Sequence, residues 1–145
     1  MAQTILAIDD SKKILDIIKY FLEGDGYGVK IASDPLEGIK LARAGGVDLI
    51  LLDIMMPGMD GYTVCDTLKK DPATKEVPVI MLTAKAIILH TPKDFFYGLY
   101  GFLAKPFSKQ QLLKVVSEAL RITKSGNTTS FIAPVGDDPD KEDDS

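Results

Sequence analysis

The sequence predicts an α/β fold, a doubly wound five-stranded parallel sheet with helices on both faces. First, short apolar runs alternate with segments whose apolar residues recur at helical spacing, five times along the chain. Second, the run LILL (49–52) is apolar throughout, which is typical of a strand buried on both faces. Third, turns rich in glycine and proline separate the units, as Pro57, Gly58 and Gly61 do after this run. Such a βα alternation favours a parallel sheet.

The five strands are expected at 4–8, 29–32, 49–52, 77–83 and 101–104. The helix expected over 34–46 has the clearest start, since Asp34 stands at its N-cap and Pro35 in its first turn. A third helix is expected from about Asp60 to Lys70. Apolar residues at helical spacing mark the first and last helices: Ile14, Ile17, Ile18, Phe21 and Leu22, then Leu112, Val115, Val116, Ala119 and Leu120. Lys30 interrupts the second strand, as is typical of a sheet edge.

Length and composition favour a globular protein of ordinary domain size. The chain has 145 residues, of which 46% are hydrophobic and 26% charged. It contains no run of 18 apolar residues, and its N-terminus reaches an acidic residue at Asp9 without the pattern of a secretory signal. We therefore expect a cytoplasmic protein without membrane insertion. The one cysteine, Cys65, excludes an internal disulfide and a cysteine-based metal cage.

Acidic charge is concentrated near the C-terminus. Residues 123–145 hold six acidic and two basic residues, so the formal charge of −4 lies there and residues 1–122 are neutral. Because residues 123–145 are also poor in core-forming side chains, we expect a disordered acidic tail behind one domain over 1–122. A neutral domain with an acidic tail gives no electrostatic reason to expect direct nucleic-acid binding.

Polar side chains stand where four of the predicted strands end. Asp9 and Asp10 follow the first strand and Asp53 follows the third, while Thr83 and Lys105 end the fourth and fifth. The carboxyl ends of parallel strands meet at one edge of the sheet, where α/β folds bind their ligands. Each of these residues alone could cap a helix or pair with a surface charge, but capping does not explain all five together.

The three carboxylates of this group predict a site for a divalent cation. Held close together, they repel one another and resist ionising at the same time, and a bound cation relieves that repulsion. Oxygen ligands select a hard ion, here Mg²⁺ or Mn²⁺. With the ion bound, Asp53 could act as a nucleophile toward phosphorus and form an aspartyl phosphate. Lys105 and Thr83 could then contact the remaining phosphoryl oxygens.

Four stretches resemble a known family: AIDDS (7–11), LILLDIMMPGMDGY (49–62), VIMLTAK (79–85) and GFLAKPF (101–107). In this order, over residues 3–122, they are similar to the receiver domain of response regulators in bacterial two-component systems. The resemblance implies a flavodoxin-like fold of the CheY type, with strand order 2-1-3-4-5.

The resemblance also implies roles for individual residues of the acidic group. Asp53 would be the phosphoacceptor. Asp10 would bind Mg²⁺ directly, Asp9 would act mostly through water, and the backbone carbonyl of Met55 would be the third protein ligand.

Other residues are implied as parts of a switch. Thr83 would supply the switch hydroxyl and Phe102 the switch aromatic side chain. Lys105 would pair with the phosphoryl group, and its bond to Pro106 would be cis.

The segment 86–102 departs from the family pattern, in which a polar amphipathic helix is usual. Pro92 would break or kink a helix there, and the segment carries too many apolar side chains for a solvated face. Two interpretations stay open. The segment packs differently against its own sheet, or it forms an exposed apolar surface for a partner, such as a homodimer interface.

The leading hypothesis is a stand-alone receiver that is not an enzyme beyond its own phosphorylation and dephosphorylation. It would take a phosphoryl group from a histidine kinase or histidine phosphotransfer protein and signal to an unidentified downstream protein by contact, since 23 further residues are too few for an effector domain. The alternative is a phosphorylation-independent docking or dimerisation module that uses 86–102. A phosphatase of the haloacid dehalogenase type would need a second aspartate at the position of Met55, so this sequence does not fit that class. A nucleotide-binding switch would need a glycine-rich loop after the first strand, and this sequence has none there.

Overall fold

The computed structural model describes residues 2–84 and 100–124, and the strands of that part form one five-stranded sheet. All neighbouring strands are parallel, in the order β2-β1-β3-β4-β5. The strands are β1 (Thr4–Ile8), β2 (Gly28–Ala32), β3 (Leu49–Asp53), β4 (Val79–Ala84) and β5 (Gly101–Lys105). The predicted α/β fold and its strand order are confirmed, with β2 at an edge as expected.

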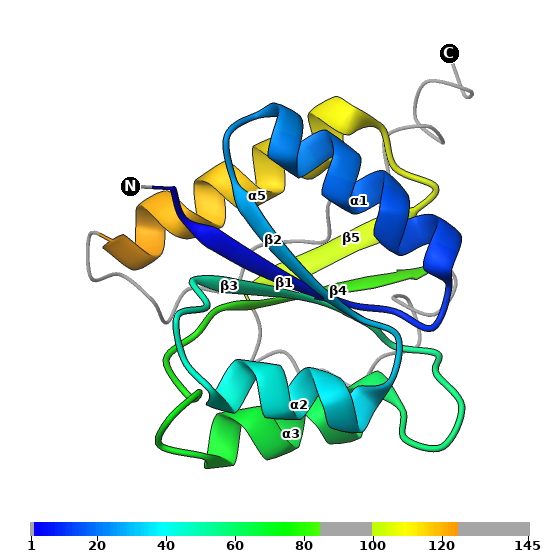
Figure 1. Ribbon diagram of the computed structural model, residues 1–145, viewed down its shortest axis with the longest axis vertical. Helices are drawn as coiled ribbons and strands as arrows, with labels where there is room; N and C mark the ends of the chain where they lie inside the picture. The colour runs from blue at the N-terminus through cyan, green and yellow to red at the C-terminus, as the bar shows by residue number, and fades with distance from the viewer. Residues whose placement is uncertain (1, 85–99, 125–145) are drawn as a thin grey trace.

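Helices cover both faces of the sheet. Those in the described part of the chain are α1 (Lys12–Gly24), α2 (Pro35–Arg43), α3 (Gly61–Lys70) and α5 (Lys109–Lys124). Figure 1 shows α1 and α5 on one face and α2 and α3 on the other. The helices that follow β1 and β3 thus leave on opposite faces, although these two strands are neighbours in the sheet. This divergence opens a crevice beyond the carboxyl ends of β1 and β3, the place where such sheets bind ligands.

A side-chain cap fixes the start of each of these helices. The N-cap residues are Ser11, Asp34, Asp60 and Ser108, and each accepts a hydrogen bond from a backbone N–H in the first turn. The last is reciprocal, because the Ser108 N–H also donates to Gln111 Oε1. Local sequence therefore determines where the chain turns from strand end into helix.

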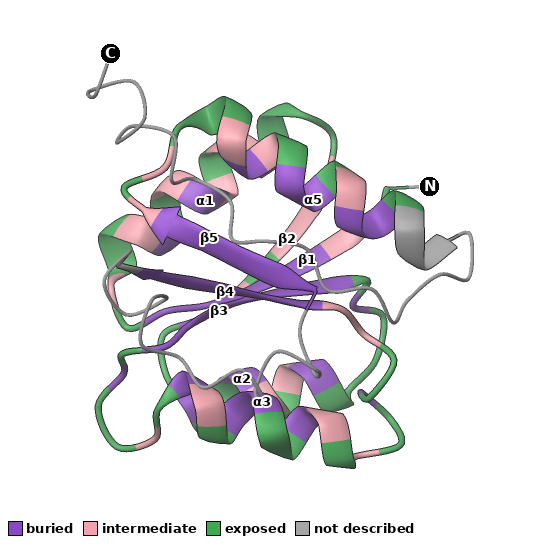
Figure 2. Ribbon diagram, turned by 180° about the vertical axis from the view of Figure 1, so that it is seen from behind, coloured by how far each residue is buried: buried purple, intermediate pink, exposed green. Residues whose placement is uncertain are grey.

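The sheet has a hydrophobic core on each face, because successive residues of a strand point to opposite sides. All five residues of β3 are buried. Ile50 and Leu52 pack in the core beneath α2 and α3, whereas Leu49 and Leu51 pack in the core beneath α1 and α5. Figure 2 shows the buried strands between helices whose outer faces are exposed. A polar side chain on β3 can therefore reach solvent only at the end of the strand, where Asp53 lies.

The bounds of two elements differ from the sequence prediction by more than one residue. β4 begins two residues later than expected, after Pro78, which has no N–H to donate to the neighbouring strand. α2 ends at Arg43, three residues early, because Gly45 and Gly46 adopt φ values of 90° and 81° that do not occur within a helix. Both differences concern ends, and neither moves a residue of the predicted site.

Some expectations fall at or beyond the described residues. α5 continues to Lys124, so the expected domain end at 122 lies inside its last turn. Most of the segment 86–102 and the tail from residue 125 lie outside the described part of the chain. Tyr100 and Phe102, at the end of that segment, are buried. None of the helices described is long and apolar enough to cross a membrane.

The start of α3 lies directly against the end of β3. The Gly61 N–H donates to the Ile54 carbonyl oxygen at 2.8 Å. A Cβ atom at Gly61 would lie 2.5 Å from the Asp53 carbonyl oxygen and 2.7 Å from Ile54 Cα. Because both are backbone atoms, they cannot move aside as the tip of a side chain can. Only glycine lets α3 begin this close to the strand that carries Asp53.

We predict that Gly61→Ala lowers the free energy of unfolding by about 2 kcal/mol, as overpacking against fixed atoms does. The matched control is Gly24→Ala at the end of α1, where an added Cβ meets nothing within 4 Å. That change should leave stability unaltered or raise it by about 0.5–1 kcal/mol, since alanine has less backbone entropy to lose. Urea denaturation measures both, and equal effects would contradict the close approach.

Candidate functional site

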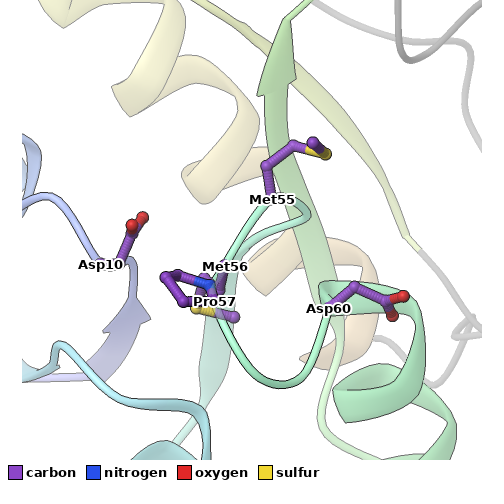
Figure 3. A pocket seen from close by; sticks show the side chains of 5 residues that line it. All are labelled: Asp10, Met55, Met56, Pro57 and Asp60. Carbon is purple, nitrogen blue, oxygen red and sulfur yellow. The ribbon is translucent and has the colours of Figure 1, made fainter.

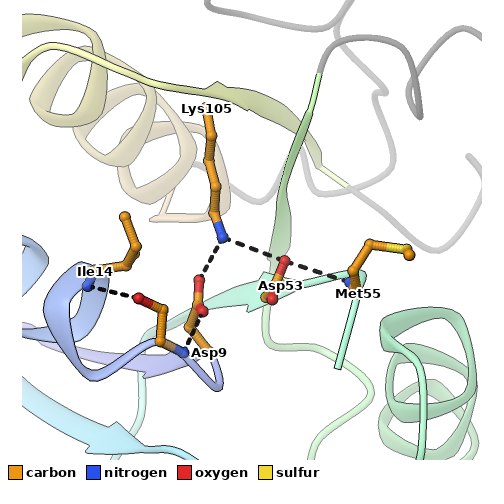
Figure 4. Close-up of polar contacts among 6 residues, drawn as sticks. Asp9, Ile14, Asp53, Met55 and Lys105 are labelled. Carbon is orange, nitrogen blue, oxygen red and sulfur yellow. Dashed lines mark hydrogen bonds and ion pairs between the residues drawn. The ribbon is translucent and has the colours of Figure 1, made fainter. Parts of the chain in front are cut away.

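The predicted site residues meet at the carboxyl edge of the sheet. Asp9 and Asp10 follow β1, Asp53 ends β3 and Lys105 ends β5. Figure 4 shows Asp9, Asp53 and Lys105 pointing toward one another. Strand register brings them together, because β1 and β3 are neighbours and the lysine side chain reaches across from β5.

One ammonium group bridges two buried carboxylates. Lys105 Nζ lies 2.7 Å from Asp9 Oδ2 and 3.3 Å from Asp53 Oδ1. Asp9 is 0% exposed and Asp53 is 3% exposed. A partner of opposite charge stabilises a buried carboxylate, and Lys105 contacts both of these.

Backbone N–H groups orient the same two carboxylates (Figure 4). The Ser11 N–H donates to Asp9 Oδ1 at 2.9 Å, and the Met55 N–H donates to Asp53 Oδ1 at 3.4 Å. Both donors lie two residues after their acceptors, so each loop folds back on the aspartate before it. The second oxygen of Asp53 has no contact with Lys105 or Met55 among those described.

The surroundings of Asp53 favour its protonated form. Burial raises the pKa of the Asp53 carboxyl from 3.8 to about 6, and the negative charge of Asp9 adds to that rise. The ammonium of Lys105 and the hydrogen bond from the Met55 N–H lower the pKa but do not cancel the rise. The ionised form of Asp53 is therefore destabilised in the folded protein, and a further cation nearby would stabilise it.

Asp10 completes an acidic group that could hold a metal ion. Asp9, Asp10 and Asp53 each offer one carboxylate oxygen, and these oxygens all lie within 4.8 Å of one another. Asp10 is exposed, so the group opens to solvent on its side. Three oxygen donors and a surplus of negative charge suit a hard divalent cation.

An open hollow of about 530 Å³ lies next to this group. It is lined by Asp10, Met55, Met56, Pro57 and Asp60. Figure 3 shows that the loop after β3 forms most of its wall, with Asp10 facing that loop from the end of β1. A small molecule or a partner's side chain could approach the acidic group through this hollow.

Thr83 is buried near the end of β4, the strand beside β3. It is 1% exposed, and within the described part of the chain its Oγ1 has no hydrogen-bond partner. Buried hydroxyls are nearly always hydrogen-bonded, so the Thr83 hydroxyl is available to a group that binds at this edge of the sheet. Phe102, on β5, is fully buried against the core beneath α2 and α3.

The structure decides between capping and a shared site for Asp10. Ser11 is the cap of α1, so capping does not account for Asp10. Thr83 Oγ1 caps none of the helices that the structure describes. The Lys105–Pro106 bond is cis, as the resemblance implied.

Sequence reasoning missed that Asp60 lines the hollow. The sequence places Asp60 at the start of a helix, where it is the N-cap of α3. It does not show the path of the loop that brings Asp60 to the hollow.

These observations define a class of protein, an α/β domain with an acidic group and a lysine at the carboxyl edge of its sheet. Residues 5–117 match the family model described as the response regulator receiver domain. The chain therefore belongs to the receiver domain family of two-component response regulators, as the resemblance predicted.

Two relatives have curated descriptions that name them as transcriptional regulators. The chain is 42% identical over 119 residues to "DNA-binding dual master transcriptional regulator RpaA" of Synechocystis sp. (strain ATCC 27184 / PCC 6803 / Kazusa), covering 82% of this chain and 49% of that protein. It is 35% identical over 120 residues to "Probable transcriptional regulator ycf29" of Pyropia yezoensis, covering 83% and 54%. The chain spans about half the length of these two relatives.

Solved structures agree with the fold and the family. A putative response regulator from Chloroflexus aurantiacus aligns with a TM-score of 0.77 and 33% identity over 83% of this chain and 99% of that one. The chemotaxis response regulator CheY4 of Vibrio cholerae aligns with a TM-score of 0.75 and 30% identity over 81% and 98%.

We predict that Asp53→Asn stabilises the metal-free protein at neutral pH. The pKa of Asp53 is higher in the folded protein than in the unfolded chain, so protonated Asp53 favours the folded state. This contribution to the free energy of unfolding is fully present below about pH 4 and is lost as the pH rises through about 6. Asparagine carries no such charge, so the variant should gain about 1–3 kcal/mol over wild type near pH 7 and little near pH 4. Denaturation with a chelator present measures this gain, and a gain independent of pH would contradict the prediction.

We predict opposite effects for two buried threonines. Thr83→Val removes a hydroxyl without a described partner and should raise the free energy of unfolding by about 1 kcal/mol. Thr74 is equally buried, but its Oγ1 donates to the Leu68 carbonyl oxygen at 2.6 Å. Thr74→Val should therefore lower stability by about 1 kcal/mol. Urea denaturation measures both variants. An equal fall in the free energy of unfolding of the two would show that the Thr83 hydroxyl has a hydrogen-bond partner.

Proposed function

We propose that this receiver domain accepts a phosphoryl group on Asp53 from a histidine kinase or histidine phosphotransfer protein. Receiver domains interact with partners of these kinds. The observation that carries the proposal is the environment of Asp53, a buried carboxylate 3.3 Å from the Lys105 ammonium and beside two further acidic side chains. The hollow lined by Asp10 and Met55, next to Asp53, supports the same role, since a donor must approach the nucleophile.

The proposed transfer is an in-line displacement at phosphorus. A carboxylate oxygen of Asp53 forms the new O–P bond as the donor's P–N bond breaks, and the donor imidazole keeps the electron pair of that bond. Lys105 pairs with the phosphoryl oxygens as their charge comes close to Asp53, and the Thr83 hydroxyl donates a hydrogen bond to one of them. The product is an aspartyl phosphate on an otherwise unchanged chain, so we propose no turnover of an external substrate.

We further propose that Mg²⁺, or Mn²⁺ in its place, binds the acidic group. Asp10 and Asp53 would hold the ion together with the Met55 backbone carbonyl, and Asp9 would act through water. The oxygen-only donor set supports this assignment. When bound, the ion supplies positive charge that neutralises the phosphoryl group and the carboxylates around it.

The phosphoryl group would act as a switch through Thr83 and Phe102. A hydroxyl that gains a phosphoryl partner draws the end of β4 toward Asp53, and the buried aromatic side chain on β5 can follow that movement. The changed surface would then alter contacts with a downstream protein. Three expectations from the sequence stay predictions. They are action as a stand-alone domain through protein contact, a cytoplasmic location, and the absence of direct DNA contact by this domain.

The alternative functions from the sequence fare differently. Membership of the receiver family replaces the haloacid dehalogenase interpretation. The phosphorylation-independent docking or homodimer module stays a prediction, because most of the segment 86–102 lies outside the described residues. Normal signalling by an Asp53→Asn strain would favour that module over the switch.

We predict a gain of one phosphoryl group in intact mass when the protein is incubated with phosphoramidate or acetyl phosphate and Mg²⁺. Asp53→Asn should show no gain, because it lacks the nucleophile. Asp16→Asn is the matched control, since it removes an exposed aspartate of α1 and should be phosphorylated like wild type. A gain of mass in Asp53→Asn, or none in wild type with Mg²⁺, would contradict the proposed function.

A further inference from the structure

Met55 presents an oxidisable sulfur at the entrance to the acidic group. It is 63% exposed, whereas Met56 is 8% exposed and Met81 is fully buried. The remaining methionine of the described part, Met59, is half-buried against the core. Oxidation of a thioether follows its exposure, so among these four sulfurs Met55 should react first.

The cysteine does not compete for the same oxidants. Cys65 is the one cysteine of the chain, and it is buried in α3. Burial raises the pKa of its thiol to about 11, so little of the reactive thiolate is present at neutral pH. The redox-reactive sulfur among the described residues is therefore a thioether.

Oxidation at Met55 would occur close to the phosphoacceptor. The Met55 N–H donates to Asp53 Oδ1, and its side chain lines the hollow with Asp10 (Figure 3). Met56 and Pro57 give that part of the wall an apolar surface. A thioether is a weak hydrogen-bond acceptor, whereas a sulfoxide is polar and binds water through its oxygen. The modification would thus place a water-binding group beside the phosphoryl site.

We propose that Met55 is a redox modification site whose sulfoxide shortens the lifetime of the phosphoryl group on Asp53. This inference rests on the proposed function and adds regulation to it. The Met55 sulfur attacks an oxygen of a hydroperoxide and its O–O bond breaks. The sulfur is oxidised by two electrons to the sulfoxide, and the peroxide is reduced to water or an alcohol. A water held by the sulfoxide then attacks phosphorus, and the bond from phosphorus to Asp53 breaks with its electron pair left on the Asp53 oxygen. The Asp53 carboxylate is regenerated, and inorganic phosphate leaves with the protons of the water.

The experiment uses hydrogen peroxide as the oxidant and intact mass as the readout of the phosphoryl group. Peptide mass mapping should find the sulfoxide at Met55 before Met56, Met59 and Met81. The phosphorylated protein should then lose its phosphoryl group roughly threefold faster than the untreated protein, the size of effect that one added hydrogen bond gives. Reduction by methionine sulfoxide reductases of both classes should restore the original lifetime.

Two variants separate this effect from general oxidative damage, each compared with itself before and after peroxide. Met55→Leu should lose the acceleration, and Met56→Leu, which alters a buried neighbour, should keep it. Preferential oxidation of a buried methionine, or an unchanged lifetime with Met55 fully oxidised, would overturn the inference. Acceleration that persists in Met55→Leu would overturn it as well. An untreated protein that forms no adduct would instead overturn the proposed function, and this coupling with it.

Discussion

The ammonium of Lys105 holds two buried carboxylates of like charge, and the rest of the site is arranged around that contact. Its nitrogen lies 2.7 Å from Asp9 and 3.3 Å from Asp53, while Asp10 brings a third carboxylate within 4.8 Å of the others. Burial and the negative charge of Asp9 together outweigh the Lys105 ammonium, so the pKa of Asp53 remains raised. The folded chain therefore carries an unrelieved repulsion at the position where a cation and a phosphoryl group would bind.

The fold makes this arrangement stable by placing it at an edge. β3 is buried on both faces, so its core residues anchor Asp53 without exposing the rest of the strand. β1 and β3 are neighbours whose following helices leave on opposite faces, and this divergence leaves room at their carboxyl ends. Because Gly61 has no Cβ, the loop after β3 can fold back until its end contacts the backbone of that strand. Apolar burial on two faces offsets the electrostatic strain at the edge.

Much of this could be predicted from the sequence, because the signals are local. Apolar periodicity indicated the strands and helices, and polar residues after apolar runs indicated the strand ends. The sequence could not show that adjacent Asp9 and Asp10 differ, one buried against Lys105 and the other exposed. That difference depends on where the chain leaves the sheet, as does the approach of Asp60 to the hollow. The late start of β4, by contrast, follows from Pro78, whose missing N–H is readable in the sequence.

We propose that a divalent cation relieves the repulsion among Asp9, Asp10 and Asp53. The most direct test is the free energy of unfolding of the wild-type protein as Mg²⁺ is added at constant ionic strength and neutral pH. We expect a saturable rise in stability that is lost in Asp10→Asn and kept in Asp16→Asn, since an ion that binds only the folded state stabilises it by mass action. A wild-type stability that does not change with Mg²⁺ would show that no such ion binds the folded protein.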